Sequence, residues 1–166
     1  MNPQSHALLR GIADTIESQV LPELQASTWT ASRLRSCLAL LRHLEQRVPV
    51  EGPLLFRENA ELEAFCAAVL ADLGQTCDAG PLLAELETLR VECRPTGAYP
   101  PVPELAAANA RYQTFLDRIV TFVHDNRPAL GADRFAELRG RIIARIRETS
   151  ERHAPMIDAA SGYSPI

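Results

Sequence analysis

The sequence of 166 residues contains no lysine, so arginine supplies all 17 of its basic side chains. This absence excludes mechanisms that need a lysine, namely a P-loop phosphate site, Schiff-base formation and general-base catalysis by an amine. The net charge is −4, so the chain also lacks the basic excess that is typical of proteins that bind nucleic acid. Arginine without lysine, together with abundant alanine and leucine, indicates a GC-rich genome, and we therefore expect a bacterial source.

Long apolar runs are absent as well. No apolar stretch approaches the roughly 18 residues of a membrane-spanning helix, and Met1–Arg10 lacks the basic and apolar regions of a signal peptide. We therefore expect a cytoplasmic protein without a membrane partner, with its four cysteines as reduced thiols. Cys37 and Cys66 fall on apolar helix faces and are predicted to be buried, whereas Cys77 lies in a loop and is predicted to be exposed.

Motifs for catalysis and for metal binding are missing too. The sequence has no nucleophile elbow, no glycine-rich phosphate loop and no C-x-x-C pair. None of its four histidines has the spacing of the helical zinc or di-iron sites. We therefore expect no catalytic residues, no metal and no cofactor.

Apolar residues recur at the three- and four-residue spacing of amphipathic helices over almost the whole chain. Sustained alternation and β-branched runs, which are typical of strands, are absent. Proline and glycine divide the helical pattern into six predicted helices, and Pro22 is expected to kink or stop the first of them. The predicted helices cover residues 5–26, 30–47, 53–74, 81–93, 104–126 and 132–153.

The segment 94–103, RPTGAYPPVP, contains four prolines and is predicted to be a stiff crossover between the fourth and fifth helices. It could return the chain to the same end of the bundle or carry it across the face of the bundle. The two helices after it could not bury their own apolar faces, so we place no domain boundary there. We predict an all-α fold, with a single helical bundle over residues 1–154 and a flexible tail over residues 155–166.

Two asparagines interrupt apolar helix faces, Asn59 in the third predicted helix and Asn109 in the fifth. The strings that begin at these residues are similar, NAELEAF and NARYQTF. A buried amide must find hydrogen-bond partners, and two interpretations are open. The asparagines could fix the register of the helices, or they could form a ligand site with Tyr112 and His124 in a pocket between helices. His124 could instead be a helix-end histidine near the last carbonyls.

Charge is distributed unevenly along the chain. Residues 51–92 contain nine acidic residues and two arginines, whereas residues 94–166 contain ten arginines and eight acidic residues. Four arginines of the last predicted helix share one stripe, namely Arg134, Arg141, Arg145 and Arg152. Glu137 and Glu148 offset this stripe locally at i,i+4 spacing. We therefore expect the stripe to pair with the acidic third and fourth helices and not to bind nucleic acid.

Three strings of the sequence carry a resemblance to known proteins, LLRGIADTIESQVLPEL (8–24), ENAELEAF (58–65) and ANARYQTFLDRIVTFV (108–123). Their layout resembles small all-helical bacterial proteins that have no assigned activity. The resemblance implies a helical fold and no particular reaction.

These observations favour a non-catalytic interaction or accessory protein that self-associates, as a homodimer, or binds a protein partner. Candidate contacts are the exposed faces of the third and fourth helices and the aromatic residues Trp29 and Tyr99. The alternative is a small-molecule-binding bundle or an unrecognised enzyme. Its pocket would lie between helices and would be lined by Asn59, Asn109, Tyr112 and His124.

Overall fold

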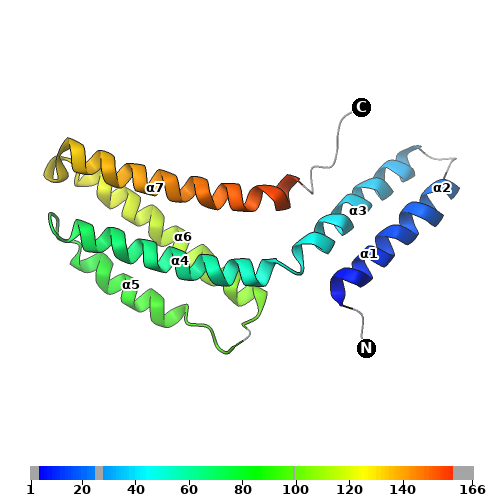
Figure 1. The fold of residues 1–166 in the computed structure, drawn as a ribbon, viewed down its shortest axis with the longest axis horizontal. Coiled ribbons are helices and arrows are strands. Elements are labelled where there is room, and N and C mark those ends of the chain that lie inside the picture. Colours follow the sequence, from blue (N-terminus) through cyan, green and yellow to red (C-terminus); the bar gives the residue numbers. More distant parts are fainter. Residues whose placement is uncertain (1–3, 25–27, 99, 159–166) are drawn as a thin grey trace. The chain divides into compact units, whose positions relative to one another are not determined.

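The computed structural model describes residues 4–24, 28–98 and 100–158. Over this part of the chain the fold is all-helical and contains no strand, which confirms the predicted fold class (Figure 1). The last helix continues to Asp158. The rest of the predicted flexible tail, residues 159–166, lies outside the described residues, as does Tyr99.

Six helical rods account for the described elements, because the first three elements follow one another without a break. The elements are α1 (Ser5–Thr15), η1 (Ile16–Val20), α2 (Leu21–Glu23), α3 (Thr28–Arg47), α4 (Glu51–Leu73), α5 (Gly80–Glu92), α6 (Val102–Asp125) and α7 (Arg127–Asp158). The helices α4 and α6 begin two residues earlier than predicted. Pro53 and Pro103 therefore lie in a first helical turn, where an N–H group would have no partner within the helix.

The predicted break at Pro22 takes the form of a π-helical turn. In η1 the N–H of Leu21 donates to the carbonyl of Ile16, five residues earlier. Pro22 has no N–H to offer to the carbonyl of Ser18, and its ring crowds the preceding turn. The wider π turn directly before the proline accommodates that ring.

The start of α7 is a single turn that ends at Gly131. This glycine has φ 74° and ψ 166°, a conformation that side-chain-bearing residues rarely adopt. The continuous part of α7 therefore begins at residue 132, as predicted.

The chain divides into two compact units, which are described separately. Unit 1 comprises Met1–Glu51 with Thr149–Ile166, and unit 2 comprises Gly52–Glu148. The single domain over residues 1–154 stays a prediction.

Unit 2 is a four-helix bundle in which each helix runs antiparallel to the next. Arg118 pairs with Glu85, and Arg111 with Glu92, so α5 and α6 are antiparallel. Asp72, at the end of α4, pairs with Arg134 and Arg141 near the start of α7, so α4 and α7 are antiparallel as well. Residues 94–98 and 100–101 are neither helix nor strand, and they join α5 to α6 at one end of the bundle (Figure 1).

The core of unit 2 is drawn from all four helices. The apolar centre of α6 lies within it, since Phe115, Leu116, Ile119 and Val123 are buried. From α4, Leu62, Cys66, Val69 and Leu73 face the same cluster. Packing of this kind fixes the relative positions of α4 and α6, the two helices that carry the predicted asparagines.

Unit 1 contains an antiparallel hairpin of α1 and α3. Arg42 in α3 donates to Asp14 at 2.6 Å and to Glu17 at 2.9 Å, and Arg10 in α1 donates to Glu45. The hydrogen bonds that Arg42 donates to the carboxylates of Asp14 and Glu17 raise the pKa of its guanidinium above its usual value. Among the residues of unit 1 whose burial the structure describes (4–24, 29–51 and 149–153), Ala13 alone is buried. The hairpin is therefore held by ion pairs on one side and has almost no apolar core.

Candidate functional site

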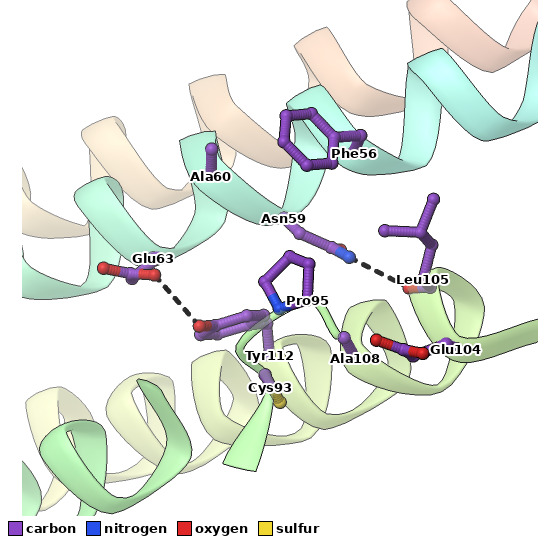
Figure 2. A pocket seen from close by; sticks show the side chains of 10 residues that line it. All are labelled: Phe56, Asn59, Ala60, Glu63, Cys93, Pro95, Glu104, Leu105, Ala108 and Tyr112. Carbon is purple, nitrogen blue, oxygen red and sulfur yellow. Dashed lines mark hydrogen bonds between the residues drawn. The ribbon is translucent and has the colours of Figure 1, made fainter. Parts of the chain in front are cut away.

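The two predicted asparagines meet between α4 and α6. Asn109 donates from its Nδ2 to the Oδ1 of Asn59 at 2.9 Å. Asn59, whose exposed fraction is 9 %, in turn donates from its Nδ2 to the backbone carbonyl of Leu105 at 2.9 Å (Figure 2). Because α4 and α6 run in the same direction, equivalent positions of the two similar strings come to the same level of the bundle.

A second polar contact lies one helical turn further along. The hydroxyl of Tyr112 donates to Oε2 of Glu63 at 3.1 Å (Figure 2). Nε of Arg90 donates to Oε1 of the same carboxylate at 2.9 Å. Tyr112 is 3 % exposed, and its burial together with the nearby negative charge of Glu63 raises the pKa of its hydroxyl well above the usual value. Tyr112 is therefore a hydrogen-bond donor at neutral pH and not a base.

These contacts border a cavity of about 170 Å³ at the end of the bundle where α5 is joined to α6. Side chains of α4 and α6 form two of its walls, and residues after α5 form a third (Figure 2). Its polar lining residues are Asn59, Glu63, Cys93, Glu104 and Tyr112. Burial raises the pKa of the Cys93 thiol, which disfavours its reactive thiolate form.

The third wall is held in place by Glu104. This residue lies in the first turn of α6, where a glutamate commonly accepts from the N–H group of the residue that caps the helix. The capping residue here is Pro101, which has no N–H group. The carboxylate of Glu104 instead accepts from the backbone N–H of Thr96 at 3.0 Å and from its hydroxyl at 2.8 Å. The connector is thereby fastened to α6, with Pro95 against the cavity.

The four predicted site residues do not all share this location. Asn59 and Tyr112 line the cavity, and Asn109 reaches it only through its hydrogen bond to Asn59. His124 lies 12 residues beyond Tyr112, which is about 18 Å along a helix axis. It is exposed near the end of α6, and its ring packs edge-to-face with Phe135 at a centroid distance of 6.1 Å. His124 does not line the cavity.

Several lining residues were not predicted from the sequence. Glu63 follows Asn59 by four residues, so the two share a helix face, and this spacing is a signal that could have identified it. Cys93, Pro95 and Glu104 come together only because the connector folds back between α5 and α6. No local pattern in the sequence indicates that contact.

Three arginines of the α7 stripe pair with α4, one of the two acidic helices with which the stripe was predicted to pair. Arg141 and Arg134 both pair with Asp72, and Arg145 donates to Glu61 at 2.9 Å. Glu137 pairs with Arg134, however, and not with Arg141 as the i,i+4 spacing suggested. These arginines therefore contribute to the association of the helices within unit 2.

The predicted environments of two cysteines need correction. Cys37 is exposed, and Cys77 is half-buried. The reason is that the apolar stripe of α3 is wider than the single helix that covers it, so Cys37 falls on the uncovered side. Cys66 is buried as predicted, and burial raises the pKa of its thiol to about 11.

Comparison with known proteins finds no family model, no curated protein and no solved structure that matches the chain. Among the described residues, no group of three or more histidine, cysteine or acidic side chains is arranged to hold a metal ion. None of the helices in the described ranges is both long enough and apolar enough to cross a membrane.

Proposed function

We propose that this chain is a non-catalytic helical interaction protein that forms a homodimer through the α1–α3 hairpin. The observation that carries the proposal is a set of exposed apolar side chains on that hairpin. Leu8 and Ile12 in α1 are 52 % and 50 % exposed, and Leu40 in α3 is 63 % exposed. Cys37 and Leu44 of α3 are exposed as well.

The ion pairs of the hairpin identify one of its two sides. Arg42 meets Asp14 there. Asp14 directly follows Ala13, which is buried in the hairpin, and Arg42 directly follows Leu41, which is half-buried there. In two antiparallel helices, the residues that follow such positions lie on one side of the pair, and the residues that precede them lie on the other.

The exposed apolar residues occupy the opposite side by the same reasoning. Ile12 precedes Ala13, and Leu40 precedes Leu41. Spacings of three and four residues add the other members to the same helix faces. We call this set the hairpin apolar face; it consists of Leu8, Ile12, Cys37, Leu40 and Leu44.

A second copy of the chain is the occupant that best fits this face. Two helices bury little apolar surface by themselves, whereas four helices enclose a core, as they do in unit 2. Two hairpins related by a twofold axis supply four helices and bring each apolar face against its equal. Residues 1–51 contain five arginines and five acidic residues, so their net charge does not oppose this association.

The proposal keeps the cytoplasmic location and the absence of nucleic-acid binding that the sequence favours. We propose no reaction for this chain. Its proposed role is that of a subunit that binds a second copy of itself.

Leu40→Glu tests the proposal, because it places a charge at the centre of the hairpin apolar face, where burial of an unpaired carboxylate is strongly unfavourable. Light scattering during gel filtration should give the mass of a dimer for the wild type and of a monomer for this variant. The matched control is Val91→Glu, since Val91 is an exposed apolar residue of α5 in unit 2; this variant should remain dimeric. A dimer in both variants would contradict the proposed interface, and a monomeric wild type would contradict self-association.

The cavity beside Asn59 favours a second candidate function, which is the binding of a small molecule between α4 and α6. Its volume of about 170 Å³ and its mixed polar and apolar walls support this alternative. We propose Asn59 and Tyr112 as lining residues of this site, with Asn109 as the residue that orients the Asn59 amide. His124 has no part in the site so defined.

A further inference from the structure

We propose that the cavity of unit 2 binds a small organic cation, namely an ammonium group attached to an apolar body about the size of a benzene ring. This inference rests on the second candidate function above and specifies the class of its ligand. It is independent of the proposed homodimer.

The charge of the cavity lining carries the first part of the argument. Glu63 and Glu104 line the cavity, and no arginine or histidine does. Arg90, which does not line the cavity, forms an ion pair with Glu63, with 2.9 Å between its Nε and Oε1 of Glu63. Glu104, in contrast, has no ion-pair partner within the described part of the chain, and its carboxylate accepts hydrogen bonds from Thr96. A concave site lined by one sign of charge attracts ligands of the opposite sign and repels ligands of its own sign.

The hydrogen-bonding groups point to the same class of ligand. An ammonium group only donates hydrogen bonds, so it needs acceptors. The carboxylate of Glu104 is one acceptor. The hydroxyl oxygen of Tyr112, whose hydrogen is given to Glu63, keeps lone pairs and can be another. A carboxylate ligand would find no cationic group among the lining residues.

The size and the walls of the cavity define the rest of the ligand. Phe56, Pro95 and Leu105 supply apolar surface, and Tyr112 supplies the face or edge of its ring. A cavity of about 170 Å³ is comparable with the engineered apolar cavity of about 150 Å³ that takes up benzene. Aromatic rings beside the site add cation–π attraction for an ammonium group.

The experiment is an NMR titration of the full-length, 15N-labelled chain with three benzene derivatives of similar size, which are benzylamine, benzyl alcohol and benzoate. We expect benzylamine to shift the amide signals of cavity residues in a saturable way. Benzyl alcohol should bind roughly fivefold more weakly, which is the effect of one partly exposed charge pair. Benzoate should cause no saturable shift at these residues.

Two pairs of measurements connect the binding to the cavity and to its charge. Ala60→Leu fills the cavity from α4 and should abolish binding, whereas Ala64→Leu, on an exposed position of α4 outside the lining, should leave binding unchanged. Glu104→Gln keeps groups that can bond to Thr96. It should weaken benzylamine roughly fivefold and leave benzyl alcohol unchanged. A merely structural role of Glu104 would weaken both compounds equally.

The possible results separate this inference from the function on which it rests. Equal binding of benzylamine and benzyl alcohol, or stronger binding of benzoate, would overturn the cation specificity and leave a small-molecule site. Failure of all three compounds to shift the cavity residues of the folded chain would overturn both.

Discussion

Asn109 donates a hydrogen bond to Asn59 at 2.9 Å, so equivalent amides from two similar strings, 50 residues apart, bind each other between α4 and α6. Asn59 in turn donates a hydrogen bond from its Nδ2 to the backbone carbonyl of Leu105. This chain of hydrogen bonds occurs at one level of the bundle only. It therefore favours one register of α4 against α6, in the way that a single buried asparagine does in a coiled coil.

Asn109→Ala should destabilise the protein by about 1–3 kcal/mol, because it leaves the Oδ1 atom of Asn59 without its partner in a buried site. The double variant Asn59→Leu, Asn109→Leu removes both amides and should be closer to the wild type than the sum of the two single leucine variants. The free energy of unfolding in urea is measured for the wild type, the two single leucine variants, the double leucine variant and Asn109→Ala. Strict additivity of the leucine variants would contradict a coupled pair.

Two exposed glycines of α7 should respond to alanine in opposite directions. An added Cβ would meet nothing within 4 Å at either position, so the difference comes from the backbone. Gly131 has φ 74° and ψ 166°, and Gly131→Ala should cost about 1–3 kcal/mol. Gly140 lies within the regular helix, and Gly140→Ala should stabilise by about 0.5–1 kcal/mol. Thermal unfolding of both variants tests this, and changes of the same sign would contradict the described break.

The contact between α4 and α7 should make stability depend on pH. Arg141 donates to Asp72 and lowers the pKa of that carboxyl below its usual value, with Arg134 adding to the effect. Because the pKa is lower in the folded state than in the unfolded state, the ionised carboxylate stabilises the fold at neutral pH. This stabilisation is lost as the pH falls through the folded-state pKa.

Asp72→Asn should therefore be less stable than the wild type at pH 7, and the difference should narrow as the pH falls below about 4. Urea midpoints at a series of pH values measure the effect. Asp133→Asn, at an exposed aspartate of α7, is the control and should show little change. A difference between Asp72→Asn and wild type that does not vary with pH would exclude this ion pair as its cause.

The Cys66 thiol should be inert in the folded protein. It is fully buried and its pKa is raised to about 11, so only about one thousandth of it is thiolate at pH 8. Iodoacetamide labelling followed by peptide mass spectrometry should find Cys66 unmodified in buffer and modified in urea. Equal rates in the two conditions would show that the core of unit 2 opens readily.

The helices were predictable from the sequence because their limits are set locally. Pro49, in the turn after α3, and Gly131, at the kink of α7, interrupt the helical pattern through their own backbone chemistry, and Pro22 is preceded by a π turn for the same kind of reason. The inward position of Asn59 and Asn109 also followed from the spacing of apolar residues. The sequence left open whether they fix the register of the helices or form a ligand site. It did not show that the two amides bind each other, because that contact requires α4 and α6 to be parallel and in register.

Other features depend on contacts that no helical periodicity indicates. Glu104 binds Thr96, eight residues earlier, across an irregular connector. The side of α3 that contains Cys37 and Leu40 is as apolar as the side that packs on α1. Periodicity therefore identified the apolar residues of this helix correctly but could not tell which of them the hairpin itself covers.

Sedimentation equilibrium of the unmodified chain tests the central claim of self-association most directly. The mass of one chain is 18.3 kDa. We predict a reversible equilibrium between this mass and twice this mass, shifted towards the monomer by Leu40→Glu and little affected by added salt, since the interface is apolar. A mass of 18.3 kDa at every concentration of the wild type would contradict the account.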